Sequence, residues 1–313
     1  MKKTYIIAVH KNPDQLKRLI EVLLDENSVF YIHVDLKIDL EIFTSKINFP
    51  KVYFIKERVN CIWGDFSQVI ATINLLKNAV LRKEPYSKIL FLSGQDYPIQ
   101  SLKEIDKYLF ENKEYEFISF DEIPYNETDK LYVNRVLKYK INVVDEKVDF
   151  RLLSPVLCSG FANFRLFISL ILRNKIKVYE ILSFIRFGRK SIFQDHFKGS
   201  NWWAFNYSTA VKILAYIEKN KTKLDKYYNY TLCADEQFFH TILKELMKIE
   251  DSIKIKCSLH YIDWQRKNVS LPVIFTAEDF NLLREQSSNF LFARKFDMDK
   301  DESILDLIDK NFL

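Results

Sequence analysis

The sequence predicts an α/β protein with a Rossmann-type, mostly parallel sheet and helices on both faces. Through the first third of the chain, short apolar runs typical of buried strands alternate with longer amphipathic runs typical of helices. The connections between the apolar runs are long enough for the crossovers that join parallel strands. The 313 residues are 48% hydrophobic and 28% charged, which is ample material for a core.

Each element of the first third follows from its own pattern. Helices are predicted where apolar residues recur at three- and four-residue spacing, at residues 14–24, 66–81 and 102–110. Strands are predicted at the compact apolar runs, residues 5–9, 29–34, 51–55, 88–92 and 117–120. Open sheets of this kind bind ligands at the carboxyl ends of their strands. The places to look are therefore Val9-His10, Val34-Asp35 and residues 92–96.

The last third resumes the same pattern after a less regular middle. It predicts strands at residues 202–205 and 259–262, helices at 208–218 and 235–247, and a helix opened by the capping box Thr276 to Asp279. The middle holds a basic amphipathic segment, residues 165–190. A helix or two docked on the core with a solvated basic face is the favoured interpretation, and a membrane-surface or lipid-linked-acceptor element is the alternative.

Glycine is scarce, which excludes several classes of phosphate site. The chain has five glycines, where average usage of about 7% would give roughly 22. No close pair exists, so a GxGxxG loop, a GxxxxGK[ST] loop and a GxSxG elbow are all absent from the sequence. Any phosphate must therefore be bound by side chains.

Charge and cysteine content narrow the partners and the location. A net charge of +5 suits an anionic ligand or an anionic membrane surface but is too small to indicate nucleic acid. The first apolar run is too short for a signal peptide, and no run approaches the ~18 apolar residues of a membrane span. We therefore expect a cytoplasmic protein, with peripheral contact to the cytoplasmic membrane face through residues 165–190 as the alternative to a freely diffusing one. The four cysteines form no CxxC pair, so no zinc site is indicated.

Five clusters of residues are candidates for a binding or catalytic site. Three surround a glycine beside polar and aromatic side chains. Each of these alone is more typical of a tight turn, but the three together indicate a binding cleft. The fourth, Asp235-Glu236, begins a predicted helix, where carboxylates are common for electrostatic reasons alone. The fifth, Arg294-Lys295, is a cation pair bracketed by apolar residues, which favours a fixed position over an ordinary surface pair.

Taken in order, these clusters and one strand end resemble the core-2/I-branching glycosyltransferase family, which contains the β-1,6-N-acetylglucosaminyltransferases and the peptide O-xylosyltransferases. The resemblance implies a GT-A fold, a UDP-sugar donor, inversion at the anomeric carbon and a glycan or lipid-linked glycan acceptor. The motifs that carry it are Ile32-His33-Val34-Asp35, Trp63-Gly64-Asp65-Phe66-Ser67, Leu92-Ser93-Gly94-Gln95-Asp96-Tyr97-Pro98, Gly199-Ser200-Asn201-Trp202, Asp235-Glu236-Gln237-Phe238-Phe239 and Leu291-Phe292-Ala293-Arg294-Lys295-Phe296-Asp297.

The resemblance assigns the catalytic and diphosphate-binding roles. Glu236 matches the family's catalytic glutamate and is the candidate general base. Glycosyl transfer also needs a cation for the charge that grows on the departing diphosphate. The strand that would carry a metal-binding Asp-x-Asp ends here in Gln95-Asp96, so no divalent metal and no other cofactor is expected. Arg294 and Lys295 are the candidates to replace the metal.

Other candidate residues line the two sides of the expected cleft. Asp35 is predicted to contact uracil or ribose, with Val9 and His10 near the base, although a lone His10 is more typical of a capping or core histidine. Asp96 is predicted to bind donor-sugar hydroxyls. On the sugar and acceptor side the candidates are Gly199, Ser200, Trp202, Asp235 and Trp264, where the tryptophans are either stacking platforms or core residues and Asp235 caps the helix or orients the site.

The resemblance also implies a domain organisation. We expect one domain over residues 1–313, with a nucleotide-binding half at 1–120, a basic insert at 121–198 and an acceptor and catalytic half at 199–313. The acetylglucosaminyltransferase branch has a further arginine near what is Ser270 here; Arg266 or Lys267 could replace it. N-acetylglucosamine and xylose both remain candidate donor sugars. A non-catalytic sugar-nucleotide-binding protein on the same fold is the alternative function.

Overall fold

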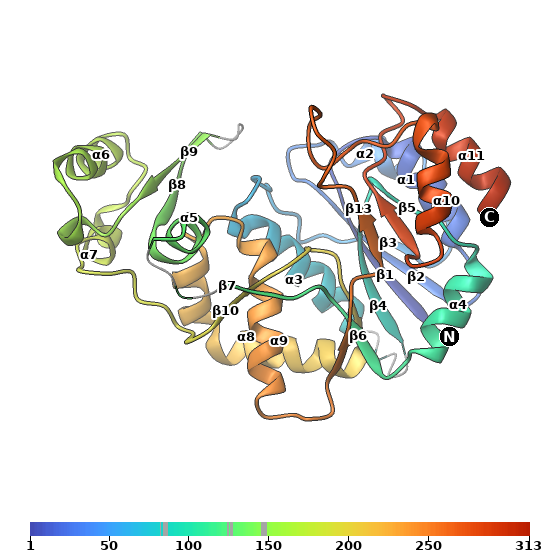
Figure 1. Cartoon of the computed structure of the whole chain (residues 1–313), viewed down its shortest axis with the longest axis horizontal. Helices are drawn as coiled ribbons and strands as arrows, with labels where there is room; N and C mark the ends of the chain where they lie inside the picture. Colours follow the sequence, from blue (N-terminus) through green and yellow to red (C-terminus); the bar gives the residue numbers. More distant parts are fainter. Residues whose placement is uncertain (82, 84–86, 124, 126–127, 145–148) are drawn as a thin grey trace.

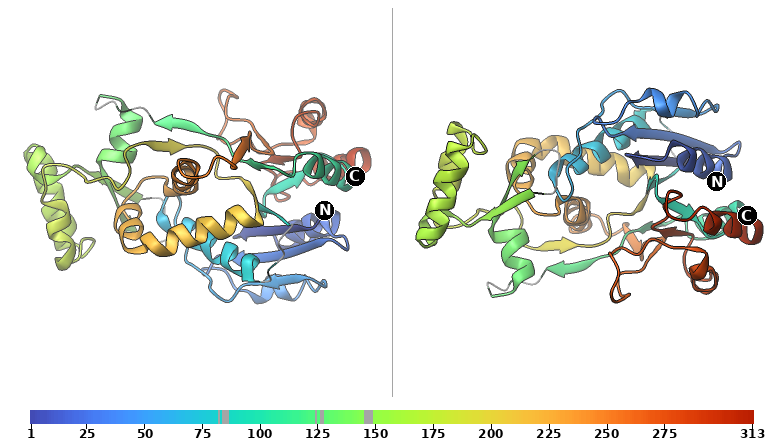
Figure 2. Two further views of the ribbon diagram at one scale, coloured as in Figure 1. Left: turned by 90° about the horizontal axis from the view of Figure 1, so that it is seen from below. Right: turned by 90° about the horizontal axis from the view of Figure 1, so that it is seen from above.

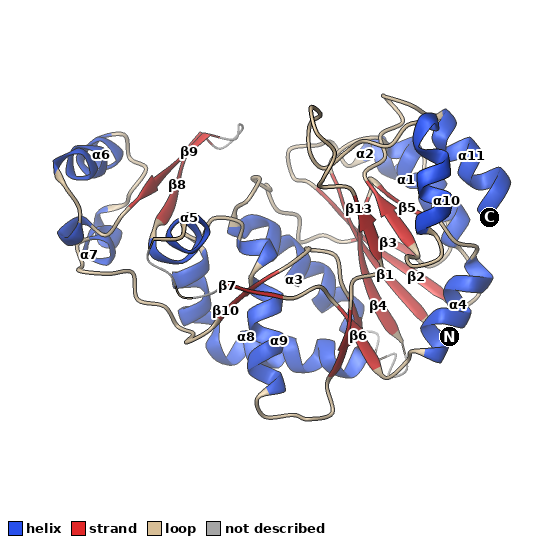
Figure 3. Cartoon of the chain, viewed as in Figure 1, coloured by secondary structure: helices blue, strands red, loops and turns tan. Residues whose placement is uncertain are grey.

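The computed structural model describes residues 1–313 except 82, 84–86, 124, 126–127 and 145–148. A seven-stranded sheet forms its centre, in the order β12-β6-β11-β4-β1-β2-β3 (Figures 1 and 3). β1, β2, β3 and β4 run parallel, whereas β11 is antiparallel to its neighbours β4 and β6. The strands are β1 (Lys3–Val9), β2 (Ser28–Val34), β3 (Val52–Phe54), β4 (Lys88–Ser93), β6 (Tyr115–Phe117), β11 (Ala204–Asn206) and β12 (Lys254–Lys256).

Helices cover both faces of this sheet because its strands are apolar on both sides. In β1, Tyr5 and Ile7 belong to one apolar cluster, while Ile6 between them belongs to the other. The first cluster contains α1 (Pro13–Leu23), α10 (Phe280–Gln286) and α11 (Ser303–Phe312), and the second α3 (Phe66–Leu81), α8 (Tyr207–Tyr228) and α9 (Phe238–Met247). The predicted α/β class is confirmed.

A second sheet lies beside the carboxyl ends of the parallel strands. It consists of β13 (His260–Ile262), β14 (Phe292–Arg294) and β5 (Asp96–Pro98), with β14 in the middle. Its register places Arg294 opposite Asp96. The remaining elements outside the insert are α2 (Glu41–Thr44) and α4 (Leu102–Glu111).

The part of the insert that holds β8, β9, α6 and α7 extends from one end of the molecule, away from the central sheet (Figure 2). Its hairpin and helices share a small apolar cluster of their own that includes Phe167 and Phe184, so the expected docking on the main core is wrong. Arg189 also differs from the expected solvated basic face, because it is buried. The insert's elements are β7 (Asp121–Ile123), α5 (Lys130–Tyr132), β8 (Tyr139–Val144), β9 (Asp149–Leu153), α6 (Phe161–Leu172), α7 (Ile181–Phe184) and β10 (His196–Lys198).

Two helix boundaries differ from the expected ones. The helix expected over 208–218 continues to Tyr228, and the helix expected at residue 235 begins at Phe238. Asp235 and Glu236 lie instead in a separate 3-10 turn, Ala234–Glu236, that follows the left-handed residue Cys233. Within the described residues, no helix combines the length and the apolar composition that a bilayer span requires.

Gly199 provides a stability test, because the chain passes too close to it for a side chain. A Cβ at this position would lie 1.9 Å from the Ser119 carbonyl oxygen and 2.7 Å from His240 Nε2. We expect Gly199→Ala to lower the free energy of unfolding by about 3 kcal/mol, measured by urea denaturation. Gly188→Ala is the matched control, since a Cβ there meets nothing within 4 Å. Equal stability of the two variants would contradict this packing.

Candidate active site

Three strand ends meet at one edge of the central sheet, as the sequence predicts. The amide of Asp35 donates to the Val9 carbonyl at 2.9 Å, and the amide of Gly94 donates to the Ala8 carbonyl at 3.0 Å. A Cβ on Gly94 would lie 2.7 Å from Val9 Cγ2, so glycine lets the turn after β4 close against β1. Val9, His10 and Asp35 therefore belong to one local site.

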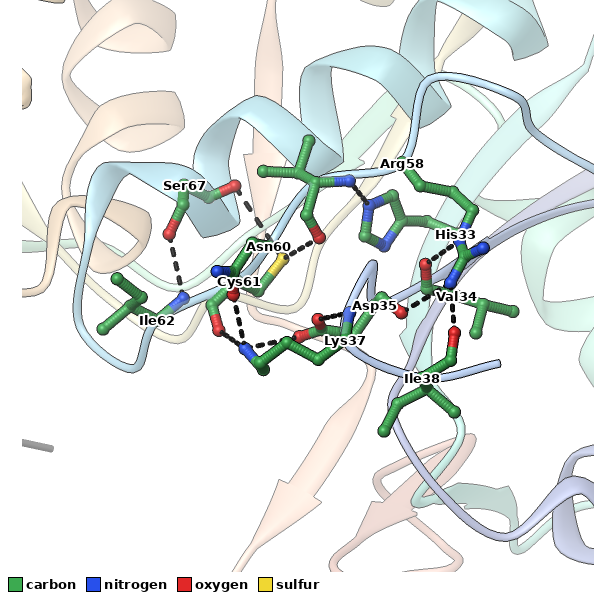
Figure 4. A network of polar contacts seen from close by, with 11 residues as sticks. His33, Val34, Asp35, Lys37, Ile38, Arg58, Asn60, Cys61, Ile62 and Ser67 are labelled. Carbon is green, nitrogen blue, oxygen red and sulfur yellow. Dashed lines mark hydrogen bonds and ion pairs between the residues drawn. The ribbon is translucent and has the colours of Figure 1, made fainter. Parts of the chain in front are cut away.

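The Asp35 carboxylate is held in a polar network at this edge (Figure 4). Its side chain is only 7% exposed and lies 3.2 Å from Lys37 Nζ. Lys37 Nζ also donates to Asn60 Oδ1 at 2.8 Å and to the Cys61 carbonyl. The loop after β3 is thereby fixed beside the Asp35 carboxylate.

Arg58 is part of the same network, and sequence reasoning did not identify it. Its guanidinium donates to the carbonyl oxygens of Val34, Asp35 and Ile38. His33 accepts a hydrogen bond from the Val59 amide at 2.9 Å, and burial lowers the pKa of His33 to about 4, so the imidazole is neutral. The partners of Arg58 are backbone carbonyl groups, which every residue has, so the sequence does not indicate the role of Arg58.

A buried ion pair between two strands of the second sheet lies next to the end of β4. Asp96 is fully buried and accepts from the Ser93 amide at 2.6 Å and from Arg294 Nη1 at 2.7 Å. Burial alone would raise the pKa of Asp96, but Arg294 and the nearby His260 hold it below its ordinary value. Asp96 has no exposed surface for a sugar, so in this conformation it positions Arg294.

Lys295 is a cation beside this pair that has no ion-pair partner among the described residues. Its ammonium makes no hydrogen bond or ion pair with any residue that the structure describes. Burial and the neighbouring cations Arg294 and Lys11 lower its pKa. Burial and the Lys295 charge also lower the pKa of His10, against the opposing effect of Asp35. An anion here would relieve the repulsion among these cations.

Residues 199–202 connect this cationic region to the predicted catalytic carboxylates. The Arg294 guanidinium lies over the Trp202 ring at 4.3 Å from its centroid. Asn201 Nδ2 donates to Asp235 Oδ2 at 3.4 Å, and the Gly199 amide donates to the Glu236 carbonyl at 3.0 Å. Trp202 thus supports Arg294, and Gly199 supports the turn that carries Glu236.

Glu236 is accessible to an acceptor, and a cation from the insert faces it. Its side chain is 34% exposed, and Oε2 lies 2.7 Å from Arg135 Nη1. Asp235 differs: its Oδ1 is buried without a hydrogen-bond partner among the described residues. Burial and the charge of Glu236 raise the pKa of Asp235 to about 7. The two neighbouring carboxyls therefore have different environments, and Glu236 is the one that a substrate can approach.

The other predicted residues lie in less defined surroundings. The Oγ of Ser200 is buried without a hydrogen-bond partner among the described residues, while its carbonyl oxygen lies 3.1 Å from His240 Nε2. Trp264 is 54% exposed in the loop after β13.

The alternative diphosphate ligand Arg266 is already paired with carboxylates, since it lies 2.8 Å from Asp279 and 3.1 Å from Asp263. No group of three or more His, Cys, Asp or Glu that could hold a metal occurs in the described part of the chain.

Comparisons with known proteins identify the family. The family model described as Branch, Core-2/I-Branching enzyme, matches residues 4–284, so the chain belongs to the core-2/I-branching glycosyltransferases. Human xylosyltransferase 2 is 23% identical over 97% of this chain and 33% of its own length. Mouse N-acetyllactosaminide beta-1,6-N-acetylglucosaminyl-transferase is 26% identical over 34% of this chain and 27% of its own length. The predicted resemblance is confirmed.

The structural comparison is more distant. The apo form of mouse xyloside xylosyltransferase 1 aligns over 93% of this chain and 97% of that chain, with 10% identity and a TM-score of 0.33. The chain spans about a third of the length of the xylosyltransferases that it matches.

The raised pKa of Asp235 predicts a pH-dependent stability. A carboxyl that stays protonated in the folded state binds more protons than the unfolded chain does, so folding is destabilised as the pH rises from about 4 to about 7. We expect Asp235→Asn to remove a loss on the order of 2–4 kcal/mol over that range. Urea unfolding at pH 5 and pH 8 measures it, with the exposed Asp251→Asn as control. Parallel pH profiles of wild type and Asp235→Asn would contradict the assignment.

Proposed function

We propose that the protein is an inverting, metal-independent glycosyltransferase. It transfers a sugar, N-acetylglucosamine or xylose, from a UDP-sugar to a hydroxyl group of a glycan or lipid-linked glycan acceptor in surface polysaccharide or lipid-linked glycan assembly. The observation that carries the proposal is the Lys295 ammonium, which lies beside Arg294 at the carboxyl edge of the sheet and has no hydrogen-bond or ion-pair partner among the described residues. The names of the relatives, which include both transferase types, support the two donor sugars.

The cation pair would stabilise the leaving group. As the bond between the anomeric carbon and the diphosphate breaks, negative charge grows on the phosphate oxygens. Lys295 can meet this charge without first giving up another partner, because none of the described residues pairs with its side chain. Arg294 is already bound to Asp96 through Nη1 and rests on Trp202, so its contribution comes from a fixed guanidinium. A preorganised cation loses little free energy to reorganisation during the reaction.

Glu236 would act as the general base on the acceptor side. An inverting displacement needs one carboxylate to take the proton of the attacking hydroxyl group. Arg135 Nη1 lies 2.7 Å from Oε2 of the Glu236 carboxylate, so a cation from the insert holds the position of the proposed base. Asp235 is bound to Asn201 and directly precedes Glu236 in the 3-10 turn, so we assign it to positioning that turn.

Glu236→Gln tests the base assignment. We expect transfer to fall by about a thousandfold or more, because the amide cannot accept the proton, while UDP binding and folding stay unchanged. Sugar transfer is measured with and without EDTA, and UDP affinity by titration calorimetry. Glu278→Gln, a substitution outside the proposed site, is the control. A fully active Glu236→Gln variant would remove Glu236 from the mechanism, and inhibition by EDTA would contradict metal independence.

Lys295→Ala tests the diphosphate assignment. Loss of a charge-assisted contact of about 1.5–3 kcal/mol predicts UDP binding weakened by roughly ten- to a hundredfold. Uridine binding should not change, since it lacks the diphosphate. Lys300→Ala, an exposed lysine that follows the same motif, is the matched control. If both variants bind UDP like the wild type, the diphosphate lies elsewhere.

A further inference from the structure

The net positive charge of the chain is concentrated in the basic segment, residues 165–190. This segment has seven Lys or Arg residues and one acidic residue, Glu180, a net charge of +6, whereas the whole chain carries +5. The rest of the molecule is therefore close to neutral. Arg165, Arg173 and Lys175 have no ion-pair partner among the residues that the structure describes. Such a local excess attracts an anionic surface.

The same part of the chain exposes large apolar side chains. Ten of the 25 exposed large hydrophobic residues of the described chain fall between residues 157 and 187. Phe161 and Leu172, at the two ends of α6, are 75% and 79% exposed, while Val178 and Leu182 are 80% and 76% exposed. Single exposed apolar residues are ordinary, but a concentration of this kind marks an interaction surface.

Helix α6 is apolar on two sides, and only one of them is covered. Phe167 and Leu170 are buried in the apolar cluster of the insert. On the uncovered side, an open groove of about 470 Å³ is lined by Phe161, Phe164, Arg165, Ile168, Leu172 and Arg173, among others. Apolar side chains and arginines therefore share one face. This combination is typical of helices that lie in the interface of an anionic membrane.

A second cationic feature adjoins the basic segment. A cavity of about 510 Å³ lies between this segment and the last turns of α8. Its lining includes five cations and no carboxylate: Arg186, Arg189, Lys190, Lys223 and Lys226. The nearby acids are already engaged, since Asp225 pairs with Lys221 and Glu180 accepts from the Lys177 amide. The positive potential thus extends beyond α6.

We propose that the insert docks the protein on an anionic phospholipid bilayer through the apolar and basic face of residues 157–187. The apolar side chains enter the interfacial region, and the surrounding Lys and Arg side chains meet the lipid phosphates. A second copy of the chain is a poorer occupant, because two segments of +6 would repel each other. Helices α6 and α7, which carry this face, lie at the end of the molecule opposite α10 and α11 (Figure 1).

Vesicle flotation tests the proposal without any need for catalysis. Wild type should bind phosphatidylcholine vesicles that contain phosphatidylglycerol, bind pure phosphatidylcholine at least tenfold more weakly, and dissociate as salt rises. Arg165→Gln/Arg173→Gln/Lys175→Gln should weaken binding on the order of a hundredfold. Phe161→Ser/Leu172→Ser/Leu182→Ser should weaken it at least tenfold, also on anionic vesicles.

Matched controls change the same kinds of residue outside the insert. Phe110→Ser/Ile249→Ser and Lys103→Gln/Lys113→Gln/Lys254→Gln, all at exposed positions, should bind like wild type. Thermal unfolding and UDP binding confirm that each variant is folded. Equal binding to neutral and anionic vesicles, or insert variants that bind like wild type, would overturn the proposal. So would a dimer that the apolar insert variants dissociate, since a second copy would then cover the face.

Discussion

The buried pair of Asp96 and Arg294 is the constraint on which the candidate active site depends. A carboxylate without exposed surface is tolerated only when its charge is paired and its oxygens are hydrogen-bonded, and Ser93 and Arg294 provide both. The pairing requires β14 to lie against β5, which brings the last part of the chain to the end of β4. Lys295 then emerges at the sheet edge beside a guanidinium that cannot move away.

Residues 199–202 make the second part of this arrangement. Trp202 supports the face of Arg294, and the next residue towards the amino terminus, Asn201, binds Asp235. The cationic and acidic parts of the site are thus linked through one short segment rather than through the sheet. Its path is close-packed, since Gly199 touches both the Ser119 carbonyl and His240. Of the five glycines, Gly94 and Gly199 are the two at which a side chain would collide with its neighbours.

The sequence predicted the sheet well, because alternating strands and amphipathic helices leave a periodic record of burial. It also predicted that Val9, Asp35 and the turn after β4 would meet, which follows from parallel strands alone. Interactions that leave no periodic pattern in the sequence were not predictable. Arg58 binds carbonyl oxygens, and Arg189 is buried with carbonyls of distant segments, so neither has a residue pattern to reveal it. The 3-10 turn before α9 depends on Cys233, whose left-handed conformation no composition signal indicates.

The insert is coupled to the candidate site through polar contacts at its base. Arg135, just before β8, faces Glu236, while Lys140 and Asn142 within β8 contact Asp65 at the start of α3. These contacts join the insert to two of the motifs, residues 63–67 and residues 235–239. If the hairpin of β8 and β9 moved relative to α3, either these contacts would break or the two motifs would move with the hairpin. Since Arg135 is also the cation that faces the Glu236 carboxylate, the insert contributes directly to the electrostatic environment of the proposed base.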